Sequence, residues 1–166
     1  MPMVVEYVKG LVESPDTPKC IIFSRHRDMT DALAEVIPED RRIIIDGRVP
    51  KAKRGPLVDQ FQEEKSPYQF CLAGLQAASE GLNMTAATLV VTTELDFTPT
   101  THIQAEARAY RNGQTRKVTS VYLLLKHSTD DCLWDMIDRK LSVLTKVLDG
   151  TSGASMLPKK RCRDQE

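Results

Sequence analysis

Apolar residues occur along the chain in short unbroken runs, separated by polar segments that contain glycine or proline. A strand covered on both faces of a sheet has no polar side, so runs of this kind favour a buried parallel sheet. We expect five strands, at residues 20–24, 42–45, 69–73, 88–92 and 118–125.

Helical periodicity fills the intervals between these runs. We expect helices at residues 4–12, 28–37, 51–64, 101–111 and 129–148. Asp28 and Thr30 are candidate caps for the second helix, and Pro38 ends it. Strands that alternate with helices predict a three-layer α/β domain, with a mostly parallel central sheet and helices on both faces.

The composition changes beyond Gly150 to small polar residues and then to a basic run at residues 159–163. We therefore expect one domain at residues 1–150 and a flexible basic tail at 151–166. The tail is either a solvated segment or a patch for nuclear import or DNA contact. A chain of 166 residues with 41% hydrophobic residues fits one core.

Charge and cysteine content exclude several classes of protein. The formal net charge is +0, from 23 basic and 23 acidic residues, so affinity for nucleic acid requires a local patch. The cysteines are widely spaced and the three histidines have no ligand spacing, so we predict no metal site or disulfide framework. No apolar run is long enough for a membrane span, and we expect an intracellular protein without a membrane partner.

Ligands of parallel sheets bind at the carboxyl ends of the strands, and polar or glycine-bearing loops follow these strands here. Residues 24–27 offer hydroxyl and guanidinium donors, which suit a nucleic-acid phosphate or a solvated loop equally. Residues 74–83 are rich in small side chains, which allow another molecule to approach closely or simply form a tight turn. Asp46 either makes a turn or caps the next helix.

The segment 104–114 is the most informative in the chain. Gln104, Arg108 and Arg111 fall at i, i+4 and i+7, so they share one face of a helix that Gly113 ends. Each guanidinium can bind two oxygens at once, which suits a polyphosphate. The alternative is a solvated helix face.

Taken together and in this order, these segments resemble the second RecA-like lobe of superfamily-two helicases of the Swi/Snf type, particularly the annealing-helicase branch. The matching segments are 19–24 (motif IV), 45–47 with Arg54 and Phe61 (the D-G-S/T segment), 76–83 (motif V) and 104–114 (motif VI, Q-A-E-x-R-x-x-R-x-G-Q). The similarity covers residues 18–150. Residues 96–99 depart from the aromatic-Trp-Asn-Pro of the family, and Tyr110 stands where His is common.

The resemblance implies roles for individual residues. Arg108 and Arg111 would be arginine fingers that reach the γ-phosphate of ATP. Nucleotide binding would also involve Gln104, Gly81 and Asn83.

The same resemblance implies DNA, duplex or fork, as a partner. The candidate contacts to its backbone are Ser24, Arg25, Gln76 and Ala77.

The sequence has neither G-x-x-x-x-G-K-[ST] nor the acidic pair that binds Mg²⁺. The resemblance therefore implies the second motor lobe of an ATP-dependent double-stranded-DNA translocase or annealing helicase, which is inactive without a first lobe. ATP and Mg²⁺ would bind only with a first lobe, in cis or in trans, and the isolated lobe would be a monomer, nuclear in a eukaryote. The alternative is a stand-alone, non-catalytic module that binds DNA or protein. A small-molecule enzyme lacks any acid, base or nucleophile constellation.

Overall fold

The computed structural model describes residues 2–76 and 81–149, and the side chains among them up to residue 140. The strands are β1 (Cys20–Ser24), β2 (Arg42–Ile45), β3 (Phe70–Gly74), β4 (Leu89–Thr92) and β5 (Thr119–Tyr122). The helices are α1 (Pro2–Glu13), α2 (Arg27–Val36), η1 (Glu39–Arg41), α3 (Lys51–Gln62), α4 (Pro99–Glu106) and α5 (Thr129–Asp149). The predicted tail at 151–166 lies outside the described residues.

The strands form one sheet in the order β2-β3-β1-β4-β5, and every neighbouring pair is parallel. β1 lies at the centre, and each of its five residues is buried. The predicted α/β fold is therefore confirmed. Because all five strands run the same way, their carboxyl ends lie along one edge.

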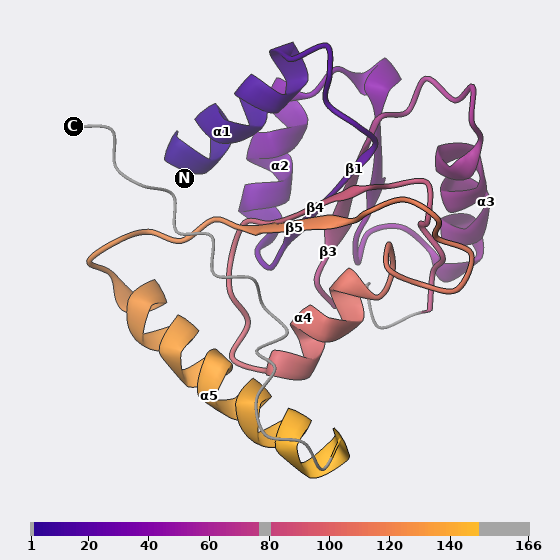
Figure 1. Ribbon diagram of the computed structural model, residues 1–166. Helices are drawn as coiled ribbons and strands as arrows, with labels where there is room; N and C mark the ends of the chain where they lie inside the picture. The colour runs from indigo at the N-terminus through magenta and orange to yellow at the C-terminus, as the bar shows by residue number, and fades with distance from the viewer. Residues whose placement is uncertain (1, 77–80, 150–166) are drawn as a thin grey trace.

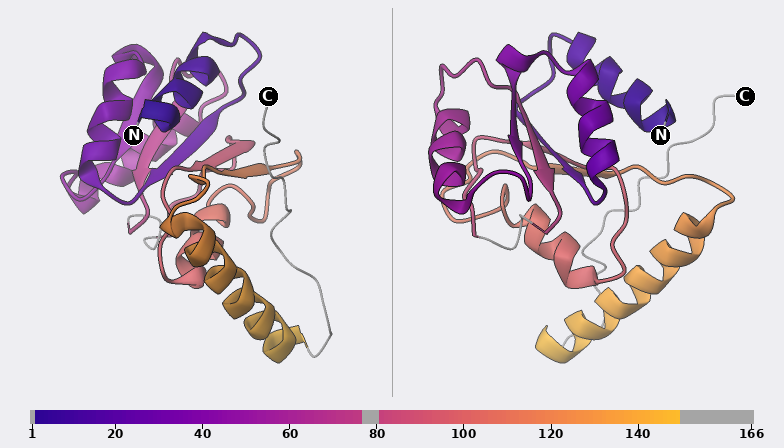
Figure 2. Two further views of the ribbon diagram at one scale, coloured as in Figure 1. Left: turned by 90° about the vertical axis from the view of Figure 1, so that its left-hand side faces the viewer. Right: turned by 180° about the vertical axis from the view of Figure 1, so that it is seen from behind.

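Helices cover both faces of the sheet, as Figures 1 and 2 show. Ile22 of β1 packs with Val8 of α1 and Leu33 of α2 in one buried cluster. Phe23, the next residue along β1, packs with Phe61 of α3 in a second cluster on the opposite face. This alternation follows from the two-residue period of a strand, and each fully buried apolar side chain contributes about 1.5–3 kcal/mol.

Two local predictions are wrong. Asp28 and Thr30 do not cap α2, because His26 is the N-cap residue, with no side-chain hydrogen bond. The strand predicted to reach residue 125 ends at Tyr122, and Leu124 and Leu125 beyond it are exposed. An apolar run alone does not show where the pairing with a neighbouring strand stops.

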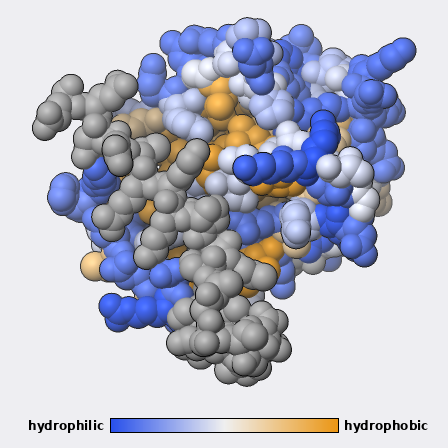
Figure 3. Space-filling view, viewed as in Figure 1, coloured by the Kyte–Doolittle hydropathy of each residue, from blue (hydrophilic) through white to orange (hydrophobic). Residues whose placement is uncertain are grey.

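Outside the core, hydrophilic residues surround a smaller group of hydrophobic ones on the face drawn in Figure 3. Among the helices that the structure describes, none combines the length and the apolar character needed to cross a bilayer.

Candidate functional site

The loops that follow β1, β3 and β4 begin side by side at the carboxyl edge of the sheet. The Thr93 amide donates to the Phe23 carbonyl at 2.9 Å, and the Leu75 amide donates to the Ser24 carbonyl at 2.9 Å. Three of the loops selected from the sequence are therefore neighbours in space.

Ser24 is buried in this arrangement, with 2% of its surface exposed. Its Oγ lies 2.6 Å from Oγ1 of Thr30, which is also buried. The prediction that Ser24 contacts DNA therefore lacks the exposed hydroxyl that such a contact needs.

Arg25, in contrast, is exposed and held in place from the loop after β4. The amides of Arg25 and His26 both donate to Oε2 of Glu94, each at 2.9 Å. The Arg25 guanidinium carbon lies 5.2 Å from the ring centre of Phe97, and its Nε lies 3.9 Å from Oδ2 of Asp96. Phe97 is 57% exposed. The cation and the aromatic ring thus form one surface feature.

The helix that leads to the two arginines is shorter than the sequence predicts. α4 ends at Glu106, and the chain continues in tight turns: the Arg108 amide donates to the Ala105 carbonyl and the Tyr110 amide to that of Glu106. The prediction that Gln104, Arg108 and Arg111 share one helix face is therefore wrong. We call residues 107–114 the arginine turn.

The arginine turn instead brings both guanidiniums to Gly81. Nη1 of Arg111 donates to the Gly81 carbonyl at 3.0 Å. Nη1 of Arg108 lies 3.8 Å from the position that a Cβ on Gly81 would occupy. Two long-range contacts fix this arrangement, since the Met84 amide also donates to the Arg108 carbonyl at 2.9 Å.

Gln104 and Asn83, the other predicted nucleotide-binding residues, are both exposed. Gln104 lies next to the arginine site, because its backbone carbonyl accepts a hydrogen bond from Nε of Arg108 at 2.9 Å.

The charges at this site are not balanced locally. Burial and, after it, the charge of Arg111 lower the pKa of Arg108, although a guanidinium stays protonated in proteins. Among the residues that the structure describes, no carboxylate forms an ion pair with Arg108 or Arg111. Two neighbouring cations without a carboxylate make a site suited to an anion with several oxygens.

Gln76, predicted to contact DNA, is exposed just beyond β3. Ala77, from the same prediction, lies outside the described residues. Asp46 makes a turn and does not cap α3: its Oδ1 accepts the Arg48 amide at 2.8 Å, and Pro50 is the N-cap residue.

α4 is anchored to β5 by groups to which the sequence assigned no role. The Tyr122 hydroxyl donates to Oε1 of Glu106 at 2.8 Å, and the Tyr122 ring lies 5.6 Å from that of His102. Nε2 of His102 lies 3.0 Å from the Asp96 amide nitrogen and 3.1 Å from the Asp96 carbonyl oxygen. Burial lowers the pKa of His102 and raises that of Glu106. These residues contact one another because α4 is partly buried against the sheet. The local sequence does not predict that packing.

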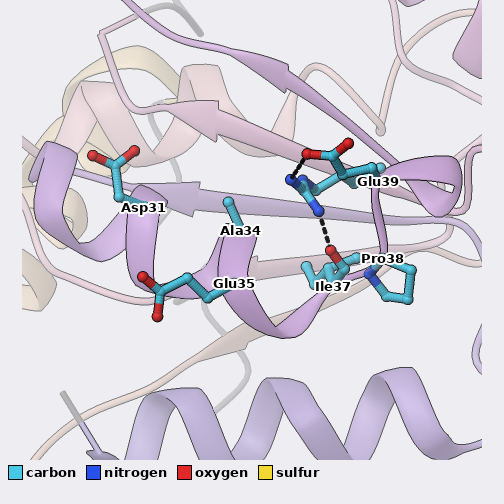
Figure 4. Close-up of a pocket in the computed structure, with 7 residues that line it drawn as sticks. Asp31, Ala34, Glu35, Ile37, Pro38 and Glu39 are labelled. Carbon is cyan, nitrogen blue, oxygen red and sulfur yellow. Dashed lines mark hydrogen bonds and ion pairs between the residues drawn. The ribbon is translucent and has the colours of Figure 1, made fainter.

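A separate depression lies between α2 and β2, and Figure 4 shows its lining. The carboxylates of Asp31, Glu35 and Glu39 surround it, and Nη2 of Arg42 lies 3.2 Å from Oε1 of Glu39. None of the predicted site residues that the structure describes lines it. Within residues 2–76 and 81–149, no group of three or more acidic, His or Cys side chains could hold a metal ion.

A five-stranded parallel sheet with helices on both faces is the architecture of a RecA-like lobe. The chain belongs to the helicase conserved C-terminal domain family, which matches residues 3–113. Its relatives are SWI/SNF-related proteins and annealing helicases, which confirms the resemblance derived from the motifs.

Two relatives illustrate the family to which the chain belongs. The chain is 40% identical over 146 residues to the Drosophila melanogaster "SWI/SNF-related matrix-associated actin-dependent regulator of chromatin subfamily A-like protein 1", covering 87% of this chain and 19% of that protein. It is 37% identical over 149 residues to the Homo sapiens "DNA annealing helicase and endonuclease ZRANB3", covering 89% of this chain and 14% of that protein. The chain thus spans a fifth or less of these relatives.

Among solved structures, the C-terminal part of the Fun30 ATPase domain superimposes with a TM-score of 0.74 at 26% identity. The match covers 81% of this chain and 44% of the Fun30 chain. The match in fold is therefore consistent with the family that the sequence comparison shows.

Proposed function

We propose that this chain is the second motor lobe of an ATP-dependent double-stranded-DNA translocase of the annealing-helicase type, with Arg108 and Arg111 as arginine fingers. The observation that carries the proposal is the convergence of both guanidiniums on Gly81 without a carboxylate partner among the described residues. Negative charge spreads over the γ-phosphoryl oxygens during hydrolysis, and guanidinium donors placed beside them stabilise it.

The lobe supplies only part of a nucleotide site. Gly81 has no side chain to obstruct a phosphate, and the exposed amides of Gln104 and Asn83 offer neutral hydrogen bonds nearby. The phosphate-binding lysine, the Mg²⁺ ligands and the group that orients water would come from a first lobe. ATP and Mg²⁺ therefore act only in the two-lobe enzyme, and this chain alone is inactive.

The exposed residues at the carboxyl edge of the sheet give the lobe a route to DNA. Arg25 offers a guanidinium and Gln76 an amide, both of which bind backbone phosphates. Ala77 belongs to the same proposed contact. Relatives named for chromatin regulation and DNA annealing support a nuclear role in DNA repair.

The test is DNA-stimulated ATP hydrolysis by the complete two-lobe enzyme. Arg108→Ala and Arg111→Ala should each lower kcat by about 10³–10⁵, the contribution of an arginine finger. Lys117→Ala removes an exposed cation beyond the turn and serves as the control. A loss smaller than about tenfold in both arginine variants would exclude the finger role, and turnover by this chain alone would exclude the second-lobe role.

One observation favours the alternative, a stand-alone module that binds DNA or protein without catalysis. Arg25 lies over Phe97, which is largely exposed, and this pair presents a cation and an aromatic face to a partner. If the chain functions in this way, Arg25→Ala and Phe97→Ala weaken DNA binding by the isolated chain, while Arg108→Ala and Arg111→Ala leave the activity of the parent protein intact.

A further inference from the structure

The side chain of Gln114 joins two segments of the arginine site. Its Nε2 donates to the carbonyls of Thr85, Ala87 and Ala109 at 2.8, 3.1 and 3.3 Å. Its Oε1 accepts the Arg116 amide at 3.0 Å. One carboxamide thus uses both its donor and its acceptor group within the protein.

These contacts close the arginine turn. The Gln114 amide donates to the Arg111 carbonyl at 2.9 Å, and Gly113 between them has a φ of +100°, which favours glycine. The carbonyls of Thr85 and Ala87 belong to the chain that follows Gly81, the residue that Arg111 contacts. Gln114 therefore ties the end of the arginine turn to the segment on which its guanidinium rests.

A second glutamine holds the same segment from the other side. Nε2 of Gln62, at the end of α3, donates to Oγ1 of Thr85 at 3.1 Å, and its Oε1 accepts the Ala86 amide at 2.7 Å. These two hydrogen bonds involve no residue of the arginine turn. Gln62 is therefore a matched control within the chain, because its loss loosens the segment without releasing the turn.

We propose that Gln114 is a positioning residue that keeps the Arg111 guanidinium on the Gly81 carbonyl. The consequence for hydrolysis rests on the proposed function, whereas the positioning itself is a property of this chain. Without the Gln114 carboxamide, three carbonyls lose a donor and the turn is no longer tied beside Thr85. Arg111 then samples orientations away from Gly81.

The experiment is NMR of the isolated chain, with Arg111 guanidinium signals assigned through Arg111→Lys. In the wild-type chain, the hydrogen bond to Gly81 slows rotation of the guanidinium and keeps its two terminal nitrogens distinct. Gln114→Met should average these signals and speed hydrogen exchange of the Met84 amide by roughly tenfold. Gln62→Met should leave the Arg111 signals distinct.

Gln114→Glu provides a second variant of nearly the same shape, which keeps an acceptor for the Arg116 amide but cannot donate. It should also average the Arg111 signals. The proposal is overturned if both Gln114 variants keep the signals distinct, or if Gln62→Met averages them to the same extent. Thermal unfolding of each variant identifies any that fail to fold.

Hydrolysis by the complete enzyme separates the two proposals. Gln114→Met should lower kcat by roughly tenfold and leave the DNA concentration for half-maximal stimulation unchanged. If Arg111→Ala has no effect on hydrolysis while Gln114→Met still averages the Arg111 signals, the finger role fails and the positioning role stands.

Discussion

Gly81 has no side chain, and this leaves room for the guanidiniums of Arg108 and Arg111 beside it. Arg111 reaches its carbonyl, and Arg108 lies where a larger side chain would point. The backbone has a φ of +76°, which glycine adopts without the steric cost that other residues incur.

Gly81→Ala should therefore lower the free energy of unfolding by about 1 kcal/mol, because the added Cβ is strained at a positive φ. The contact with Arg108, at 3.8 Å, is an ordinary van der Waals distance and adds little. Chemical denaturation of the isolated chain measures the change.

Gly10→Ala is the matched control, since Gly10 lies within α1 and its Cβ would meet nothing within 4 Å. That substitution should stabilise the chain by roughly 0.5–1 kcal/mol. Equal changes for the two glycines would contradict the role of the positive φ.

The sequence predicts Arg108 and Arg111 as site residues because their residue types and spacing resemble motif VI. It did not predict how they meet, because the Met84 amide and the Gly81 carbonyl that fix the turn are distant along the chain. In the structure the helix ends at Glu106, before either arginine. Local periodicity describes a helix but not the tertiary hydrogen bonds that end it.

At the scale of elements, α4 positions the arginine turn because its buried face is fixed against β5. His102 is 1% exposed, and its Nδ1 has no hydrogen-bond partner within the described residues. Nε2 lies 3.0 Å from the Asp96 amide nitrogen and 3.1 Å from the Asp96 carbonyl oxygen, so the neutral ring has a partner at Nε2 in either tautomer. A second proton would place a charge inside this cluster.

The chain should therefore lose stability as the pH falls below about 6.5, the ordinary pKa of histidine. Burial lowers the pKa of His102 in the folded state, with a smaller opposing effect of Asp96. In this range the unfolded chain binds the proton and the folded chain does not, so acid favours unfolding. Denaturation at a series of pH values measures the slope, and His102→Gln should reduce it.

The other two histidines provide the control, because His26 and His127 are exposed. Their replacement by glutamine should leave the slope unchanged. Glu106 acts in the opposite sense, since burial raises its pKa and its contribution is lost as the pH rises through that value. Comparing wild type with His102→Gln at each pH cancels the Glu106 contribution. An unchanged slope in His102→Gln would contradict this account.

The strands were predicted better than the helix ends. The predicted bounds of β1 and β2 agree with the structure, because polar residues and turn-forming residues flank both apolar runs closely. The predicted β5 is too long, since Leu124 and Leu125 continue its apolar run into solvent beyond Tyr122, the last residue that pairs with β4. The end of a strand depends on its hydrogen-bonded pairing with the neighbouring strand, and that pairing joins residues that are distant in the sequence.

At the scale of the whole molecule, the balanced charge restricts the DNA binding that we propose for this chain. With a net charge of +0, no overall field attracts a polyanion, and exposed cations such as Arg25 must act locally. Binding should then depend on a few phosphate contacts and fall steeply with salt.

Arg25→Ala should weaken duplex binding by the isolated chain and reduce the slope of log K against log salt by about 1, the value for one phosphate contact. Fluorescence anisotropy over a salt series measures this slope. Lys9→Ala removes a cation of α1 that pairs with Glu13, and it should leave the slope unchanged. Equal slopes for wild type and Arg25→Ala would show that Arg25 makes no phosphate contact.

The central position of β1 also makes two thiols into reporters of the integrity of the sheet. Cys20 of β1 and Cys71 of the adjacent β3 are fully buried, and burial raises the pKa of both thiols, that of Cys71 to about 12. Thiolates are the reactive form, so a thiol reagent reaches these residues only when the sheet opens. Cys132 of α5 is exposed and reacts directly. The rate at which Cys20 and Cys71 are modified therefore measures how often the domain opens through its core.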